Sequence, residues 1–235
     1  MAASFFHLGR PFKAYRALLR LSTSWLSREV TLFGIFILCL AAYSLPGNML
    51  GSGQARDLLG ILAAGFGLIA LVATGAVYRL QARPAWNHWS TVVQFVVGAL
   101  SAGLLTGWLV WSVVAAGSLA SSTDVAILGP IVGFSLVLSP ILTWMRYYRL
   151  QKGGDEARET WRLVSGKYRW LLATRIAGAA VGLLMLLISG WAIAWLFAVL
   201  GEIADRVLFF IAAVPLSMPA RSGVPIFSTS IAGRS

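Results

Sequence analysis

Residues 171–214 read LLATRIAGAAVGLLMLLISGWAIAWLFAVLGEIADRVLFFIAAV, an almost unbroken apolar run. A helix needs about 20 apolar residues to cross a bilayer, so this run is long enough for two crossings. Within it only Ser189 and Gly190 offer a turn. The stretch therefore predicts a hairpin of two membrane-spanning helices, near residues 171–188 and 191–214.

The rest of the chain is also rich in apolar residues. Of its 235 residues, 58% are hydrophobic and only 11% are charged, far from the composition of soluble proteins. Four more apolar runs lie near residues 30–45, 58–77, 92–116 and 125–145. We therefore expect an all-α, polytopic transmembrane helix bundle of about six spans. It would form a single integral-membrane domain over residues 1–235, with an interfacial segment at 1–29 and a tail at 215–235.

Several classes of cofactor chemistry are excluded for this chain on its own. The single Cys39 cannot form a disulfide framework or hold an iron–sulfur cluster. Two histidines outside the predicted spans do not make a bis-histidine haem site, and neither a Walker loop nor a dinucleotide fingerprint is present. No metal site is predicted, and any electron carrier must belong to another chain.

Lysine and arginine are distributed unevenly between the two ends of the predicted bundle. The first segment carries five, the loop around Arg79 and Arg83 two, and the loop 146–169 seven, whereas the intervening connections hold only Arg56. Under the positive-inside rule the basic loops and the C-terminus are cytoplasmic. A docking surface for a partner subunit is an alternative explanation of the same face. The net charge of +11 then reflects these loops and anionic lipid headgroups, so no nucleic acid partner is expected.

Residues 4–30 read SFFHLGRPFKAYRALLRLSTSWLSREV and concentrate scarce titratable groups at the membrane surface. Beyond Pro11, apolar and basic side chains fall on separate stripes, which favours a helix lying in the headgroup plane. A solvated basic loop is the alternative.

His7 and Glu29 are the candidate proton-handling pair of this segment. An imidazole titrates near neutrality, and a partly desolvated carboxylate can be shifted towards the same range. A histidine that accepts a proton from a quinol hydroxyl, backed by a carboxylate leading to water, would suit quinol oxidation. Taken singly, each residue has an ordinary explanation: His7 as a surface residue, and Glu29 as an acid that favours the dipole of the following helix.

Four charged residues lie within predicted spans, where charge is costly and is usually paired or functional: Arg175, Glu202, Asp205 and Arg206. Glu202 and Arg206 are four residues apart and share a helix face. Folding the last two spans about Ser189 and Gly190 sets Arg175 level with residue 204, so we expect Arg175 to reach Asp205. The group is either a structural ion-pair clamp or a buried proton relay.

Three Gly-x-x-x-Gly motifs, at 103–107, 129–133 and 178–182, also lie within spans. Small residues at this spacing let helix backbones approach closely. We interpret all three as packing motifs.

Short motifs along nearly the whole chain resemble the membrane anchor subunit of the dimethyl sulfoxide reductase family. The most specific are His7-Leu8-Gly9-Arg10-Pro11, Arg16-Ala17-Leu18 and Ser24-Trp25-Leu26-Ser27-Arg28-Glu29. Individually weaker elements are Tyr78-Arg79, Ala82-Arg83-Pro84-Ala85-Trp86-Asn87, Gly201-Glu202 with Arg206, and Leu208-Phe209-Phe210. Family members typically have eight spans, about two of them ahead of the His-Leu-Gly element. The sequence is therefore expected to be N-terminally shortened.

The resemblance implies a haem-free anchor in the bacterial inner membrane that binds no cofactor itself. It would hold an iron–sulfur electron-transfer subunit and a molybdopterin catalytic subunit, and would exchange electrons with menaquinol or ubiquinol. His7 matches the family's quinol-site histidine and Glu29 its acidic partner; Arg10 and Arg28 would shape the site or the docking face. Related anchors serve other molybdoenzymes, including sulfite-oxidising ones, so the terminal substrate does not carry over. A proton-coupled small-solute transporter built on the buried charges, or a passive membrane tether, are the alternatives.

Overall fold

The computed structural model describes residues 20–45, 53–80, 83–114 and 122–212, and within these ranges it contains helices and no strand. In chain order the helices are α2 (Trp25–Tyr43), α4 (Gly53–Val77), α5 (Trp89–Val114), α6 (Ser122–Tyr148), the short 3₁₀ helix η2 (Arg149–Lys152), α7 (Asp155–Ser165), α8 (Arg169–Leu187) and α9 (Trp191–Ile211). The predicted all-α polytopic bundle is confirmed for this part of the protein. The proposed tail at 215–235 and most of the interfacial segment lie outside the described residues.

Within the described ranges, five helices are long and apolar enough to cross a membrane: α2, α4, α5, α6 continued into η2, and α8. The sixth predicted span corresponds to α9, which has 21 residues but includes Glu202, Asp205 and Arg206. These charged residues distinguish α9 from the other five helices, although its length falls within their range of 19 to 27 residues. α9 depends on its neighbours to accommodate these charges.

The first helix begins earlier than the sequence predicted. α2 starts at Trp25, so Arg28 and Glu29, expected in the interfacial segment, lie in its first two turns. Ser24 caps the helix because its hydroxyl accepts a hydrogen bond from the Ser27 amide at 3.3 Å. This cap satisfies a backbone donor that the start of a helix would otherwise leave free.

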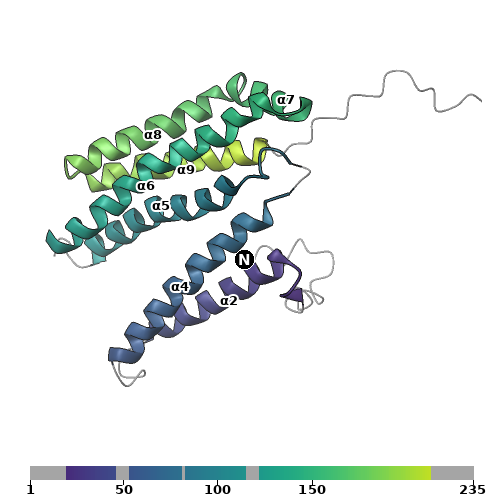
Figure 1. Ribbon diagram of the computed structural model, residues 1–235. Coiled ribbons are helices and arrows are strands. Elements are labelled where there is room, and N and C mark those ends of the chain that lie inside the picture. The colour runs from purple at the N-terminus through teal and green to yellow at the C-terminus, as the bar shows by residue number, and fades with distance from the viewer. Residues whose placement is uncertain (1–19, 46–52, 81–82, 115–121, 213–235) are drawn as a thin grey trace, which may run out of the picture.

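The helices form two units that meet at one end (Figure 1). In the first, α2 packs along α4 as a hairpin. In the second, α5, α6, α8 and α9 form a four-helix bundle in which α5 and α8 each contact both α6 and α9. α4 packs against α5, and the hairpin then diverges from the bundle (Figure 1).

The joint between the two units is a close backbone contact extended by aromatic rings. A Cβ atom on Gly75 would lie 2.6 Å from the Cα atom of Val92, so α4 and α5 touch directly there. Tyr78, at the end of α4, makes ring contacts with four aromatic residues of the bundle unit: Trp86, Phe95, Phe209 and Phe210. The Trp86 indole also donates a hydrogen bond to the Phe209 carbonyl at 2.8 Å. The individually weaker sequence elements around Tyr78, Trp86 and Phe209, which are distant in the sequence, therefore meet in one aromatic cluster.

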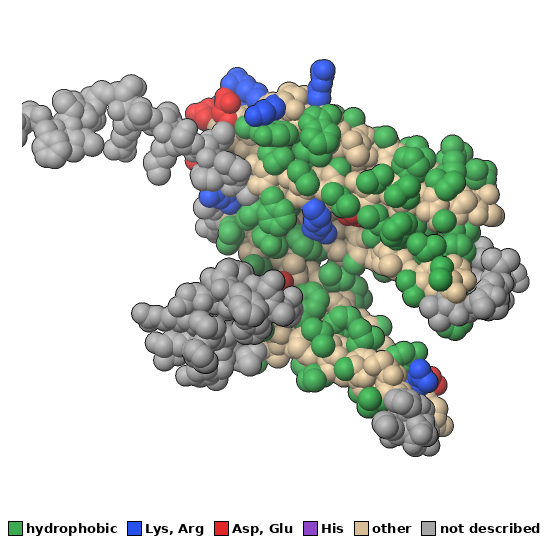
Figure 2. Space-filling view, turned by 180° about the vertical axis from the view of Figure 1, so that it is seen from behind, with side chains coloured by type: hydrophobic (Ala, Val, Ile, Leu, Met, Phe, Trp, Pro, Cys, Tyr) green, Lys and Arg blue, Asp and Glu red, His purple; other side chains and the backbone are tan. Residues whose placement is uncertain are grey.

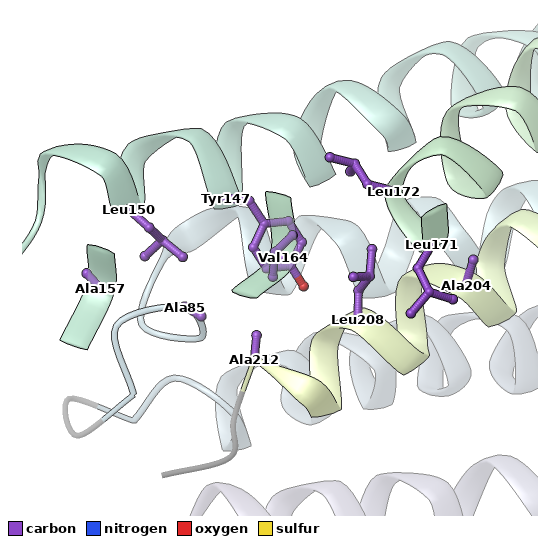
Figure 3. Packing of buried hydrophobic residues seen from close by; sticks show 10 residues of the cluster. All are labelled: Ala85, Tyr147, Leu150, Ala157, Val164, Leu171, Leu172, Ala204, Leu208 and Ala212. Carbon is purple, nitrogen blue, oxygen red and sulfur yellow. The ribbon is translucent and has the colours of Figure 1, made fainter. Parts of the chain in front are cut away.

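α7 closes one end of the bundle. Its Ala157 and Val164 are buried among residues of α6, α8, α9, η2 and the loop before α5 (Figure 3). Its opposite face carries the exposed pairs Asp155–Arg158 and Glu159–Arg162. This division of apolar and charged faces is the one expected of a helix lying at the surface of the membrane.

The predicted turn between the last two spans is confirmed. Ser189 has φ 61°, a left-handed conformation, and the Gly190 amide donates to the Met185 carbonyl at 2.7 Å. This hydrogen bond satisfies a carbonyl at the end of α8 while the backbone reverses direction.

The packing interpretation of the glycine motifs holds for one of them and is wrong for another. At 178–182, a Cβ atom on Gly178 would lie 2.7 Å from the Phe197 carbonyl oxygen, so α8 and α9 are in backbone contact. At 129–133 the glycines meet only side chains, at ordinary distances. At 103–107 no atom of the described residues lies within 4 Å of either added Cβ, because this face of α5 turns away from the other described helices.

We predict that Gly178→Ala destabilises the protein, because the added methyl group forces α8 and α9 apart. Overpacking of this kind costs about 1–3 kcal/mol. Gly103→Ala is the matched control in α5 and should leave stability unchanged or slightly raised, since alanine favours a helix. The measurement is the thermal unfolding midpoint in detergent, and equal effects of the two substitutions would contradict the prediction.

Candidate functional site

The basic segments lie at one end of the molecule. The start of α2 lies beside the end of α4, as the hydrogen bond from Thr74 of α4 to Glu29 of α2 shows. The loop after α4 meets the segment after α6, because the Arg149 guanidinium donates to the Pro84 carbonyl. The predicted clustering of the basic loops on one side is thus confirmed for the described residues, and the assignment of that side to the cytoplasm remains a prediction.

Glu29 links the two helices of the hairpin. The Thr74 hydroxyl on α4 donates to Glu29 Oε1 at 2.8 Å, and the carboxylate is half-buried between α2 and α4. His7 and Arg10, its predicted companions, lie outside the described residues.

Arg28 holds the segment that leads into α2. Its Nε and Nη2 donate to the carbonyls of Leu21 and Ser22 at 2.8 and 2.7 Å. Its guanidinium also lies 4.4 Å from the ring centroid of Trp25. The same arginine lines a cavity of about 260 Å³ between α2 and α4, formed by Leu21, Trp25, Arg28, Thr31, Leu32, Ile69, Val72 and Ala73. Arg28 therefore both shapes this apolar cavity and orients the segment before it.

A second polar group is buried in the four-helix bundle and consists of two ion pairs. Arg175 on α8 bonds Glu202 on α9 at 2.7 Å, and Arg146 on α6 bonds Asp205 on α9 at 2.8 Å. All four side chains are at most 11% exposed. Isolated charges at such depth would be prohibitively costly, so the pairing explains how α9 can lie in the bundle.

The predicted contact between Arg175 and Asp205 is wrong. The backbone contact of α8 with α9 places the Arg175 guanidinium against Gly201, 3.2 Å from where its Cβ would lie, and so beside Glu202. Asp205, one turn further along, takes Arg146 from α6 instead. The prediction was based on α8 and α9 alone, whereas a third helix, α6, supplies the partner of Asp205.

Neutral donors add to the ion pair at one oxygen of each carboxylate. Glu202 Oε1 accepts from Ser139 at 3.3 Å and Ser101 at 3.4 Å, and Asp205 Oδ1 accepts from the Thr143 hydroxyl at 2.7 Å. Ser139 also accepts a hydrogen bond from Gln94 on α5 at 2.7 Å. The result is one connected hydrogen-bonded group that spans α5, α6, α8 and α9.

A glycine leaves the space that the Glu202 carboxylate occupies. A Cβ atom on Gly98 of α5 would lie 2.7 Å from Glu202 Oε2. Any larger residue there would collide with the carboxylate, so α5 is shaped around it.

Arg206 is partly buried and differs from the buried Arg146 and Arg175 because no carboxylate pairs with it among the described residues. Its guanidinium carbon lies 3.9 Å from the ring centroid of Phe95, and its Nη1 has no hydrogen-bond partner within the described part of the protein. A cation over an aromatic face gains some electrostatic stabilisation but leaves the N–H donors free.

Sequence reasoning missed Arg146, Ser139 and Thr143. Arg146 was assigned to a loop, but α6 continues to Tyr148 and buries it. The signal was present as a polar stripe: Ser135, Ser139, Thr143 and Arg146 follow one another at intervals of three or four residues in an otherwise apolar run. Such spacing keeps side chains on one helix face.

His88 caps α5 at the same end as the basic loops. The Ser90 amide donates to His88 Nδ1 at 3.3 Å, and Nδ1 also lies 2.7 Å from the Ser90 hydroxyl. Burial and the nearby positive charges of Arg149, Arg79 and Arg146 lower the pKa of His88 below its ordinary value. The neutral imidazole is the form that can accept these hydrogen bonds.

No cluster of three or more histidine, cysteine, aspartate or glutamate side chains suited to a metal ion occurs in the ranges that the structure describes.

Comparison with protein families shows the family to which the protein belongs. The model of the DMSO reductase anchor subunit (DmsC) matches residues 1–212. The chain belongs to this family. It is a membrane anchor subunit of the DMSO reductase type.

Two curated relatives illustrate the range of this family of anchor subunits. The anchor is 36% identical to a sulfite dehydrogenase subunit of Allochromatium vinosum, over 45% of its own length and 36% of the relative. It is 30% identical to a component of the anaerobic dimethyl sulfoxide reductase of Haemophilus influenzae, over 42% of its own length and 37% of the relative. The matched stretches thus span little more than a third of each relative. No solved structure matches the anchor significantly.

We predict that Arg146→Leu strongly destabilises the anchor subunit, because it leaves Asp205 buried without its counter-charge. Breaking a buried pair costs about 3–5 kcal/mol. The double variant Arg146→Leu/Asp205→Leu should recover most of this loss, since no lone charge remains. Glu159→Gln, which disrupts an exposed pair on α7, is the control and should change stability by less than about 0.5 kcal/mol. Thermal unfolding in detergent measures all three, and a double variant as unstable as the single one would refute the explanation.

We also predict that the stability of the anchor subunit falls as the pH drops below 6.5, the ordinary pKa of histidine. Because the pKa of His88 is lower in the folded protein, the unfolded state binds the proton first, and protonation favours unfolding. Stability is therefore greatest above this pH and declines through the window below it. His88→Asn keeps a capping acceptor without the titration and should flatten this part of the profile, measured as the unfolding midpoint between about pH 8 and about pH 5. An unchanged profile in the variant would exclude His88 as the cause.

Proposed function

We propose that this anchor subunit oxidises a quinol, menaquinol or ubiquinol, in the bacterial inner membrane. The electrons would pass to an iron–sulfur subunit and from there to a molybdopterin catalytic subunit. Membership of the anchor family and the names of the two relatives support this assembly. The observation that carries the proposal is Glu29, which is half-buried, is held by Thr74 and follows His7 within the sequence segment 4–30.

Oxidation of a quinol releases two protons and two electrons, and the residues of the anchor would handle the protons. His7 would hydrogen-bond the quinol hydroxyl and accept its proton, and Glu29 would relay protons towards water. Glu29 is suited to the second role because its only hydrogen-bond partner in the described residues is a neutral hydroxyl. The electrons would leave through the partner subunit.

Arg10 and Arg28 would shape the site. Arg28 ties the segment before α2 to the helix through two carbonyls, so it would fix the direction from which His7 approaches. The cavity beside it, about 260 Å³, lies near the lower end of volumes common for small-ligand sites, about 300 Å³. Its lining is mostly apolar, as the ring and tail of a quinol require.

A proton-coupled solute transporter is a second candidate, because buried charges in α8 and α9 are typical of transport pathways. In the bundle, Arg175, Glu202 and Asp205 are engaged in ion pairs that also involve a third helix, which supports the clamp interpretation for these three residues. Proteoliposomes of the anchor alone should show no solute flux if it acts as an anchor. Binding of a quinone analogue that is lost on changing His7 would count against a passive tether.

We predict that His7→Ala and Glu29→Gln each abolish quinol-coupled turnover of the assembled complex while leaving assembly intact. The alanine removes the proton acceptor, and the glutamine keeps the hydrogen bond from Thr74 but cannot carry a proton. Glu156→Gln, at an exposed position on α7, is the control for loss of one carboxylate. Turnover is followed with a soluble quinol and, separately, with an artificial donor that bypasses the quinol. Full quinol-dependent activity in both site variants would reject the proposal.

A further inference from the structure

The Thr74 hydroxyl, which donates to Glu29, has a second acceptor within its own helix. Its Oγ1 lies 2.8 Å from Glu29 Oε1 and 3.0 Å from the carbonyl oxygen of Ala70. A hydroxyl carries one hydrogen and two lone pairs, so it can donate to one group while it accepts from another. A threonine within a helix can bond the carbonyl four residues before it. The hydroxyl of Thr74 therefore has two orientations, one toward Glu29 and one toward Ala70.

These two orientations match the two protonation states of a carboxyl group. An ionised carboxylate can only accept hydrogen bonds, so it uses the hydrogen of the hydroxyl. A protonated carboxyl group can donate its own hydrogen to the hydroxyl oxygen, and the hydroxyl hydrogen then needs another acceptor. The Ala70 carbonyl is that acceptor. Both states of Glu29 thus find a hydrogen-bond partner at the same oxygen atom.

Thr74 lies near the contact that fixes the hairpin to the bundle. On the face shown in Figure 2, the hairpin meets the bundle at one end and diverges from it beyond. The next residue, Gly75, is the glycine at which α4 touches the backbone of α5, and the preceding residue, Ala73, is buried. Because tertiary contacts hold the backbone here, the hydroxyl can rotate while its oxygen stays within reach of Glu29.

A second threonine has the same geometry in a different electrostatic setting. The Thr143 hydroxyl lies 3.1 Å from the carbonyl four residues before it and 2.7 Å from Asp205 Oδ1. Asp205 also has the Arg146 guanidinium as its counter-charge. The Glu29 carboxylate, in contrast, accepts from Thr74 alone among the described residues. The hydroxyl is an additional donor at Asp205, whereas at Glu29 it is the donor on which the position of the carboxylate depends.

We propose that Thr74 is a positioning residue that holds Glu29 in both of its protonation states. Its hydroxyl donates to the ionised carboxylate. When Glu29 takes up a proton, the hydroxyl turns to the Ala70 carbonyl and accepts a hydrogen bond from the carboxyl group. The hydroxyl proton stays on its oxygen throughout, so Thr74 neither gains nor loses a proton. This role rests on the proposed function in one respect, namely that Glu29 changes its protonation state during quinol oxidation.

Kinetics of the assembled complex test this role. Thr74→Val keeps the size of the side chain and removes the hydroxyl, so it should lower the quinol-coupled kcat about tenfold, the effect of one hydrogen bond to a charged group. KM should change by less than about twofold, because Thr74 acts through Glu29 and not on the quinol. Thr74→Ser keeps the hydroxyl and should restore kcat. If Thr74→Val fails to assemble, Thr74→Ala removes the same hydroxyl and should lower kcat by a similar factor.

Thr174→Val is the matched control. Thr174 is exposed on α8, and its hydroxyl donates to the Trp170 carbonyl four residues before it, with no carboxylate as a second acceptor among the described residues. The substitution therefore removes the same hydroxyl-to-backbone bond without touching Glu29. It should change neither kcat nor KM.

Infrared spectroscopy of the same complexes measures the hydrogen bond itself. Difference spectra between an acidic and a neutral sample show carboxyl groups that gain a proton, and the Glu29 band is the one that Glu29→Gln lacks. In Thr74→Val this C=O stretching band should move to higher frequency, because the protonated carboxyl group loses its partner. Thr74→Ser should return the band to its original position, and Thr174→Val should leave it there.

The outcomes separate this role from the proposed function. A Glu29 band at the same frequency with and without the Thr74 hydroxyl, or no Glu29 band at all, overturns the role of Thr74. A Thr74→Ser variant as slow as Thr74→Val overturns it too, since a merely structural need for threonine would then explain the loss. Full quinol-dependent turnover in Glu29→Gln rejects the proposed function instead, and a band that shifts in Thr74→Val still supports the two orientations of the hydroxyl.

Discussion

Buried charge is the constraint on which the four-helix bundle depends. α9 brings Glu202 and Asp205 into a protein interior surrounded by lipid, where each carboxylate needs a counter-charge and neutral donors. The partners come from α6 and α8, and α5 provides space at Gly98. Because one network engages all four helices, the charges determine which helices are neighbours, a selection that apolar side chains in lipid make only weakly.

The α2–α4 hairpin is assembled on other principles. It meets the bundle through a glycine contact and an aromatic cluster around Tyr78, and its two helices are linked by the hydrogen bond from the Thr74 hydroxyl to Glu29. The carboxylate that we assign to proton transfer is thus kept outside the ion-pair network.

The sequence was sufficient for the class of fold, the number and approximate position of the long helices, and the turn at Ser189. Each of these depends on local properties: the length of an apolar run and the scarcity of turn residues within it. Glu202 and Asp205 could also be selected as special, because charge inside an apolar run is conspicuous. The ion-pair partners of Glu202 and Asp205 could not be predicted from the sequence. Arg146 had been placed outside the membrane, and its role depends on how far α6 extends. The packing prediction for the glycines at 103 and 107 was wrong for a related reason. The spacing places small residues on one helix face, but it does not determine whether another helix covers that face.

Composition and the spacing of apolar residues thus establish a polytopic helical membrane protein, with its basic segments at one end. Motifs in the sequence, supported by the family match, make it an anchor subunit. The three-dimensional arrangement alone assigns Arg175 to Glu202 and Arg146 to Asp205, leaves Arg206 over Phe95, and brings Thr74 beside Glu29. The physical reason is that periodicity is a property of one helix, whereas a partner for a buried charge is supplied by whichever helices pack against it.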